Sequence, residues 1–403
     1  MRRAFTNATI WTAAGDPIEE GTLVVEDGRI VAVGTGVDLE GAEVVDCSGK
    51  VFTPGFIDCH SHAGISGEGT MGDGDVNEMS EPIAPHVRML DAIHPEDLGF
   101  VDARRGGVTT MGITHGSALA IGGQVAATKT AGTVADEMVI REPAGLKMAL
   151  GENPKRVGER GKRAPMTRGG TAYLARKAFT AAQEYQRDWD HHRELVAAQE
   201  AMDPDERKPV REPKRDLSLE TLARVLDGEF PVRNHSHRMD DIRTAIRLSE
   251  EFGYRLVIDH ATEAHRMIDE IVRRDLPLVV GPIAGTRSKR ELLNRTPATV
   301  GIMVEAGARV AITCDAPVNA IWMLRDLAIF CIREGLAPEK ALATVTTVPA
   351  EILGVDDRVG SLEPGKDADF LVFGGDPWDA RHLPEQTWVD GELVFELTGP
   401  YLP

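Results

Sequence analysis

Short apolar runs alternate with amphipathic segments of helical spacing from about residue 54 to residue 352 of this chain. The apolar runs include GVTTMGITHG, YRLVIDHAT and ARVAITCDA, and the amphipathic segments include DDIRTAIRLSEEFG and AHRMIDEIVRRD. Strands that are apolar along their whole length are typical of a parallel sheet buried on both faces. Six to eight such units over about 300 residues predict a (β/α)8 TIM barrel rather than an open doubly wound sheet. No early Gly-x-Gly-x-x-Gly motif suggests a dinucleotide-binding sheet.

The two ends of the chain have a different sequence pattern. Residues 1–53 contain short β-type runs separated by Gly and Asp-Gly turns, and residues 355–403 resume the pattern in SLEPGKDADFLVF and QTWVDGELVF. Short strands with such turns are typical of a small all-β unit. We therefore predict a small β-sandwich domain formed by both termini, 1–53 plus 355–403, attached to an α/β barrel over 54–354.

One connection inside the barrel segment is unusually long. About 80 residues separate the expected strands on either side of Glu152 and Pro231, whereas a usual connection holds ~2–6 residues and one helix. The segment is charge-rich, with one long helical stretch and the solvated connector DPDERKPVREPKRD. We predict a helical insertion at about 153–230 that leaves the barrel at its catalytic end and covers the mouth. A surface helical hairpin without a functional part fits the same residues equally well.

The charge balance limits the partners of the chain. Its 45 Lys and Arg against 64 Asp and Glu give a net charge of −19, which argues against a nucleic-acid or anionic-membrane partner. Four scattered cysteines without a Cys-x-x-Cys pair are expected to be buried thiols in a reducing compartment. No apolar run approaches the length of a membrane span. We expect a cytoplasmic protein that acts on a small-molecule substrate and assembles as a homo-oligomer.

Two pairs of histidines stand at the ends of apolar runs. TPGFIDCHSH ends in His60 and His62, and NHSH contains His235 and His237 at the same spacing. Residues i and i+2 of a strand point to the same face, so each pair would present two imidazoles side by side. Either pair alone would also fit an exposed polar strand end.

Four further polar residues interrupt or end apolar runs: Lys147, Glu152, His260 and Asp315. The carboxyl ends of barrel strands meet at one face, where active sites form, so these side chains would converge with the histidine pairs. Imidazoles and carboxylates without a thiolate cluster fit Zn²⁺, Fe, Mn or Ni in a catalytic site. The sequence therefore predicts a catalytic centre with one or two metal ions, and Zn²⁺ is the preferred one.

The motifs PGFIDCHSH, NHSH, IDHATEAH, TCDAP and VGSLEPGKDADFLVF resemble those of the amidohydrolase superfamily. Within it the chain most resembles the imidazolonepropionase-like metal-dependent amidohydrolases, a group that also contains prolidase-like and carboxypeptidase-like members. The resemblance covers nearly the whole chain and implies the barrel and the two-ended β-sandwich. It also implies that His60 and His62 bind the more buried metal ion together with Asp315.

For a second metal ion, the resemblance implies His235 and His260 as ligands and a bridging group on the fourth strand. Lys147 and Glu152 compete for the role of the bridge. Lys147 lies inside the apolar run GLKMAL, where an unpaired ammonium is costly to bury, and carboxylation would convert it into a ligand. Glu152 needs no modification. A third possibility is that Lys147 faces the outer helices and reaches solvent.

The reaction implied is hydrolysis of a C–N bond in an amide, a cyclic amide or a peptide-like substrate by attack of metal-bound hydroxide. Asp315 would accept the proton of the attacking water and return it to the leaving nitrogen. His237 or His265 would help to stabilise the oxyanion, although a structural role for His265 is equally expected. If Lys147 is the bridge, Glu152 is free to hold water or substrate.

Substrate contacts are less clearly marked. The Gly-rich segment THGSALAIGGQ would bring flexible backbone near the site, with Gln124 as a substrate-binding residue. Arg156, Arg168 and Arg287 follow strand ends and would suit a substrate carboxylate, although each also fits an ordinary surface position. Such a basic set beside the site of an acidic protein favours a small anionic substrate.

Two other interpretations remain open. A deaminase of a nitrogen heterocycle, built on the same scaffold, would release ammonia instead of opening an amide. A non-catalytic barrel that had lost its metals would be free to lose ligand residues as well. The presence of the complete set argues against that second interpretation: His60, His62, His235, His260 and Asp315.

Overall fold

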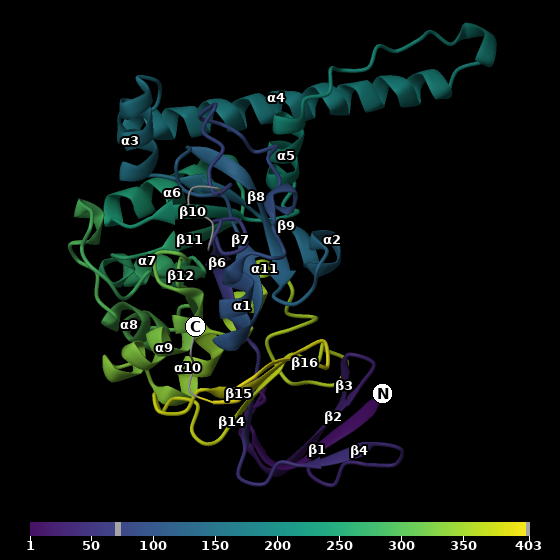
Figure 1. Cartoon of the computed structure of the whole chain (residues 1–403). Coiled ribbons are helices and arrows are strands. Elements are labelled where there is room, and N and C mark those ends of the chain that lie inside the picture. The colour runs from purple at the N-terminus through teal and green to yellow at the C-terminus, as the bar shows by residue number, and fades with distance from the viewer. Residues whose placement is uncertain (69–73, 400–403) are drawn as a thin grey trace.

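The computed structural model describes residues 1–68 and 74–399, which form two eight-stranded sheets with helices around one of them (Figure 1). The larger sheet has the order β13-β12-β11-β10-β9-β8-β7-β6. Its strands are β6 (Phe56–Ser61), β7 (Val108–Ile113), β8 (Ile121–Lys129), β9 (Val139–Ala149), β10 (Val232–Ser236), β11 (Leu256–His260), β12 (Leu278–Val280) and β13 (Val310–Ile312). Apart from the first half of β9, these strands are buried, as the apolar runs predict.

The first and last strands of this order, β6 and β13, meet through side-chain and loop hydrogen bonds. The hydroxyl of Thr313, just after β13, donates to the carbonyl of His60 at 2.7 Å. The amide of Cys314 donates to the carboxylate of Asp58 at 2.8 Å. These contacts bring the sheet nearly to closure, so the molecule contains an α/β barrel of eight strands.

One strand departs from the predicted all-parallel barrel. β8 runs antiparallel to both neighbours, pairing Thr110 of β7 with Lys129 and Gly145 of β9 with Val125. A parallel crossover needs a dozen or more residues, whereas only residues 114–120 join β7 to β8, so the chain has to turn back as a hairpin. Of the three glycines predicted to form a flexible loop beside the site, Gly122 and Gly123 lie inside β8, and Gly116 lies in the connection before it.

The helices lie around the barrel and in the long insertion (Figure 1). They are α1 (Leu98–Arg105), α2 (Ala135–Met138), α3 (Glu152–Gly161), α4 (Arg168–Glu200), α5 (Leu217–Leu226), α6 (Met239–Phe252), α7 (Ile268–Arg273), α8 (Ala298–Glu305), α9 (Leu324–Arg333), α10 (Pro338–Thr344) and α11 (Thr347–Leu353). Short 3-10 turns are η1 (Met89–Ala92), η2 (Pro204–Glu206), η3 (Ala264–Arg266), η4 (Arg290–Leu292) and η5 (Ile321–Met323). No helix of the described ranges is long and apolar enough to cross a membrane.

The long helix α4 packs along the side of the barrel. Near its start Arg168 forms an ion pair with Asp241 in the first turn of α6. Further along, the ring of Phe179 stacks on that of Tyr254 beyond the other end of α6, with 4.9 Å between centroids. The rest of α4 extends away from the barrel, and the chain returns beside it (Figure 1). The predicted cover over the mouth is therefore wrong for α4, because its apolar face packs into the barrel's outer layer.

The smaller sheet combines both chain termini in the order β16-β15-β14-β5-β1-β2-β3, with β4 paired to β1. Its strands are β1 (Arg2–Ile10), β2 (Ile18–Glu26), β3 (Arg29–Gly34), β4 (Glu43–Asp46), β5 (Val51–Pro54), β14 (Phe370–Phe373), β15 (Pro384–Val389) and β16 (Glu392–Glu396). It has an aromatic core, in which the rings of Phe370 and Trp388 stack 5.3 Å apart. The expectation that this unit is a sandwich stays a prediction.

A buried cluster of charges attaches the smaller sheet to the barrel. Lys129, at the end of β8, forms ion pairs with Asp367, Asp369 and Asp390 at 2.9, 2.8 and 2.9 Å. Asp367 also contacts Arg358 at 2.8 Å. An unpaired buried ammonium would be costly, so the three carboxylates fix the position of the sheet relative to β8.

Candidate metal centre

The histidines predicted at strand ends lie together at the carboxyl end of the barrel. His60 belongs to β6, His235 to β10, and His260 is the last residue of β11. His62 and His237 directly follow β6 and β10. Parallel strands place their carboxyl ends on one face of a barrel, which explains why residues so distant in sequence meet here.

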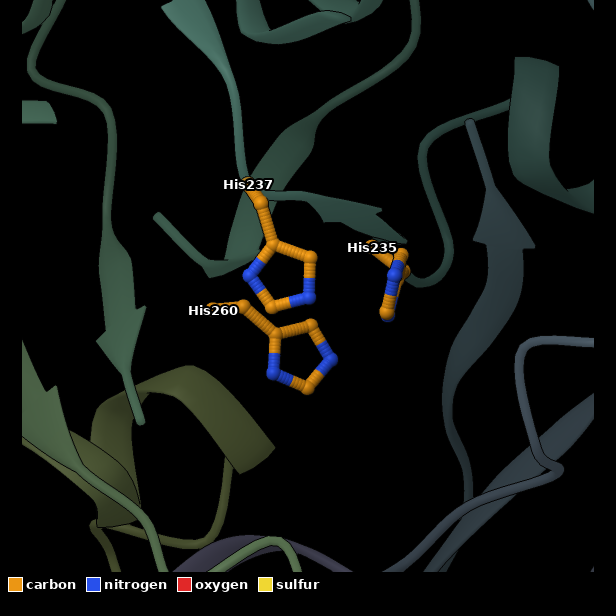
Figure 2. Close-up of side chains that lie close together, drawn as sticks. All are labelled: His235, His237 and His260. Carbon is orange, nitrogen blue, oxygen red and sulfur yellow. The ribbon is translucent and has the colours of Figure 1, made fainter. Parts of the chain in front are cut away.

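Three of these imidazoles form one compact group. His235, His237 and His260 are buried and each offers a ring nitrogen, with these atoms within 4.8 Å of one another. The ring centroids of His235 and His260 are 4.2 Å apart. Figure 2 shows the three side chains lying close to one another. His237, predicted to act on the oxyanion, therefore lies among the potential metal ligands.

A second group shares His260 with the first. It contains His60, His260 and Asp315, whose ligand atoms also lie within 4.8 Å of one another. Asp315 follows β13, and its carboxylate is 3.7 Å from Nε2 of His60 and 3.4 Å from Nε2 of His62. His62 belongs to neither group, but its Nε2 lies beside the carboxylate of Asp315.

Most of these imidazoles are oriented by a hydrogen bond at Nδ1. The partners of Nδ1 are Asp259 for His60 at 2.9 Å, Thr114 O for His62 at 2.7 Å, Thr262 Oγ1 for His237 at 2.8 Å, and Gly281 O for His260 at 2.8 Å. A partner at Nδ1 leaves Nε2 as the ligating atom and fixes the direction in which it points.

The buried nitrogens test whether these residues fit a metal ion. Among the described residues, both ring nitrogens of His235 and Nε2 of His260 have no hydrogen-bond partner. Burial lowers the pKa of His60 to about 3 and of His260 to about 4, and holds the pKa of His235 well below its usual range. Neutral imidazole is the form that ligates metals. Buried, neutral and partnerless nitrogens beside a carboxylate fit a divalent cation.

Asp315 keeps its negative charge in this setting. Burial acts to raise the pKa of its carboxyl, but the neighbouring His260, His62 and His60 outweigh it and hold the pKa below the usual range. A carboxylate that is ionised, largely buried and close to three imidazoles can serve as a metal ligand and as a proton acceptor.

Lys147 lies inside the barrel beside His60. It is 1% exposed, and its Nζ is 3.1 Å from Nε2 of His60. Burial lowers the pKa of its ammonium to about 8. The interpretation in which Lys147 faces the outer helices is therefore wrong, because its side chain points toward the histidines.

Glu152 is the first residue of α3, at the same end of the barrel. Its carboxylate lies 2.6 Å from the guanidinium of Arg156, and its amide donates to Glu291 at 2.6 Å. Neither metal-ligand group contains Glu152. Of the two bridging candidates, only Lys147 contacts a histidine of the cluster.

Two charged residues beneath the cluster were not predicted. Arg233 donates to Asp259 at 2.8 Å, and Asp259 holds His60 at 2.9 Å, so a buried chain of charges supports one ligand. Arg233 pulls the pKa of Asp259 below its usual range although burial opposes it. The available signal was a charge inside an otherwise apolar run: Arg233 two residues before His235, and Asp259 next to His260.

Lys289 was also missed, although it lies in the loop that contains the predicted Arg287. Its side chain is 15% exposed, and its Nζ lies 3.3 Å from Oδ1 of Asn153 and 3.5 Å from Glu291. Burial lowers the pKa of its ammonium, while Glu291 and Asp315 act in the opposite direction. Lys289 is thus a largely buried cation at the mouth of the barrel.

Two side chains predicted to contact substrate, Gln124 and Arg168, have other partners in the structure. Gln124 donates to Pro85 O and Thr221 Oγ1, both at 3.2 Å, and so faces α5 instead of the site. Arg168 is held by Asp241 and Glu291. Long-range carboxylate partners of this kind cannot be read from local sequence.

The two remaining candidates also have local partners. Arg287 is exposed and donates to Leu293 O at 3.1 Å, within its own loop. His265 has its Nδ1 2.9 Å from the hydroxyl of Thr299 on α8 and belongs to neither metal-ligand group. The structural role foreseen for His265 fits this contact.

Comparison with known proteins gives one family. A profile described as the Amidohydrolase family matches residues 234–396. A solved amidohydrolase from Thermotoga maritima MSB8 is 39% identical, with a TM-score of 0.90, over 98% of this chain and 100% of that one. The chain is 32% identical to amidohydrolase tasK of Hapsidospora irregularis over 97% of its own length, but spans only 43% of that protein. It is 23% identical to an imidazolonepropionase of Rhizobium rhizogenes, covering 92% of this chain and 91% of the relative.

Proposed function

This chain belongs to the amidohydrolase family of enzymes that hydrolyse C–N bonds, and we propose that its histidine cluster holds a catalytic divalent metal for hydrolysis of a small anionic amide or cyclic amide. The observation that carries the proposal is His235, whose two buried ring nitrogens have no partner among the described residues. A buried polar atom without a partner costs about 1–3 kcal/mol, which a coordinated cation offsets.

The ligands proposed are the two groups that share His260. His235, His237 and His260 would hold one ion, and His60, His260 and Asp315 would hold the other, with His62 adjacent to Asp315. A single imidazole nitrogen serves one ion, so with two ions His260 would bind only one of them and the other ion would need a further ligand. Carboxylated Lys147, bridging both ions, would supply that ligand. Its proximity to His60 supports this assignment. Zn²⁺ suits this nitrogen and oxygen set best.

A divalent metal at this position would activate water as a nucleophile at neutral pH and polarise the scissile carbonyl. Asp315 is ionised and would take the proton from that water. It would then deliver the proton to the leaving nitrogen, so one carboxylate serves as base and acid in turn.

Lys289 would position the substrate. Its ammonium is largely buried and lies beside Asn153 at the mouth of the barrel. Lys289 is in the same loop as the predicted Arg287. Glu291 neutralises part of this charge at 3.5 Å, and Arg168 in turn binds Glu291 at 3.0 Å. Arg168 also binds Asp241, so the two cations of this set face two carboxylates, and the proposed attraction of an anionic substrate group rests on the largely buried ammonium of Lys289 alone.

The experiment that tests this function combines metal analysis with a substrate screen. Purified protein should contain about one or two divalent ions per chain, and their removal by a chelator should abolish turnover. N-acyl amino acids, dipeptides, lactams and imidazolones are offered, each with a matched neutral amide. We expect a new carboxylate and a new amine in the product. Ammonia as the sole nitrogen product would identify a deaminase instead, and metal-independent turnover would refute the proposal.

A further inference from the structure

A cavity lies at the end of the barrel opposite the histidine cluster. Its volume is about 370 Å³, and residues at the amino ends of five strands line it: Arg141 of β9, Pro231 before β10, Leu256 of β11, Pro277 before β12 and Arg309 before β13. The volume falls within the range of small-molecule sites. The metal-ligand residues lie at the carboxyl ends of the strands, so this cavity is separate from the proposed catalytic centre.

Arginines dominate the charge of this cavity. Four of them line it, Arg141, Arg255, Arg274 and Arg309, against the two carboxylates Asp275 and Glu351. Four positive and two negative charges leave a net charge of +2 on the lining. Such a concentration of cations is unexpected on a chain of net charge −19.

Two of the four arginines are already neutralised. Arg309 binds the carboxylate of Asp275 at 2.8 and 3.0 Å and lies 3.9 Å from Glu351. Arg274 pairs with Glu250 at 2.8 Å. Both carboxylates of the lining are therefore directed to Arg309.

The other two arginines keep most of their donors. Arg141 donates to Gly354 O at 2.7 Å, and Arg255 donates to Gly228 O at 2.8 Å. Within residues 1–68 and 74–399, neither forms an ion pair or any further hydrogen bond. A guanidinium has five N–H donors. Arg141 and Arg255 thus present unpaired positive charge and free donors to the cavity.

Gly354 leaves room for this arrangement. It ends α11 with φ at +68°, and a Cβ added there would lie 2.8 Å from Nη1 of Arg141. The lining around the arginines is mixed: Leu256, Val257 and Leu353 belong to it but are almost fully buried, whereas Leu276 and Pro277 are partly exposed. The cavity therefore combines a cationic rim with a small, partly exposed apolar surface.

We infer that this cavity is a second binding site, for a small organic anion whose carboxylate or phosphate faces Arg141 and Arg255. The apolar body of the ligand packs against Leu276 and Pro277. Arginine forks favour these oxyanions because two parallel N–H donors match two oxygens.

Calorimetric titration of the metal-loaded protein with phenyl phosphate, and with phenol as the neutral counterpart, tests this inference. Phenyl phosphate should bind and phenol should not. Arg141→Gln and Arg255→Gln should each weaken binding at this site by about tenfold or more, since one charge-assisted contact is lost. Arg333→Gln removes an exposed arginine on α9, outside the cavity, and should leave the titration unchanged.

Arg255 is exposed, so its substitution tests the site even if Arg141→Gln fails to fold. Arg255→Lys keeps the charge without the fork and should fall between the wild type and Arg255→Gln. Unchanged binding of phenyl phosphate in both glutamine variants would assign that binding to the metal centre or another surface and would overturn the inference. This outcome leaves the proposed hydrolase activity untouched, because the screen for that activity measures turnover at the opposite end of the barrel.

Discussion

The carboxylate of Asp259 lies 2.9 Å from Nδ1 of His60, and both side chains are completely buried. This contact fixes which nitrogen of His60 faces Asp315 and Lys147. Arg233 holds the other oxygen of the same carboxylate, so the orientation of one candidate ligand on β6 depends on a charge on β10.

Asp259→Asn is expected to lower metal affinity or turnover by about 10- to 100-fold, as seen for residues that orient metal ligands. The amide retains the shape but loses the charge that pairs with Arg233. Metal content after dialysis and kcat are the measurements. Asp240→Asn, at an exposed carboxylate on α6, is the control. Full metal content and activity in Asp259→Asn would show that the contact only supports the fold.

Asp315→Asn is expected to lower kcat by several orders of magnitude while metal content falls less. Asparagine keeps one ligand oxygen but cannot accept and return a proton. Steady-state kinetics and metal analysis on the same preparation separate the two effects. Turnover near that of the wild type would remove Asp315 from the proton transfer.

Lys147→Ala is expected to reduce two bound ions toward one, if a carboxylated Lys147 is the bridge. The pKa of about 8 leaves part of the amine neutral near pH 7.5, the form that reacts with CO₂. Bicarbonate should therefore raise metal uptake of the wild type but not of the variant, and added short carboxylates should partly rescue the variant. Glu152→Gln is the matched comparison: if it loses an ion and Lys147→Ala does not, Glu152 is the bridge.

Lys289→Met is expected to raise KM for an anionic substrate about 10- to 100-fold, the range of one charge-assisted hydrogen bond. KM for the matched neutral amide should change little. Arg287→Met alters an exposed cation of the same loop and controls for a general change in charge. Equal effects on both substrates would exclude recognition of the anion by Lys289.

The gathering of the candidate metal-centre residues at one end of the barrel could be predicted from the sequence, because each residue ends or interrupts an apolar run. His60, His235 and His260 lie on three strands, and barrel geometry brings their ends together wherever the connections run. Asp259 and Arg233 follow the same rule, since a charge inside a buried strand needs a partner. Which partner it has depends on strand register, which pairs Arg233 with Lys147 and His235 with Asp259.

The direction of β8 and the course of α4 could not be predicted in this way. An apolar run has the same pattern in both directions, and only the short 114–120 connection determines that β8 runs back. Arg168 pairs with Asp241 on α6 and Glu291 in η4, which lie far along the chain. The local sequence therefore shows the arginine but not the carboxylates that pair with it.

The antiparallel β8 has a consequence for the order in which the barrel can form. β7, β8 and β9 are consecutive strands joined by short connections, so pairing them costs little loop-closure entropy. Closure of the barrel instead joins Thr313 to His60, 253 positions apart along the chain. Since local contacts form faster than distant ones, we expect the β7–β9 meander to act as an early folding unit and the metal centre to assemble last. Pulsed hydrogen exchange should protect the amides of β8 before that of Thr313, and simultaneous protection would contradict this order.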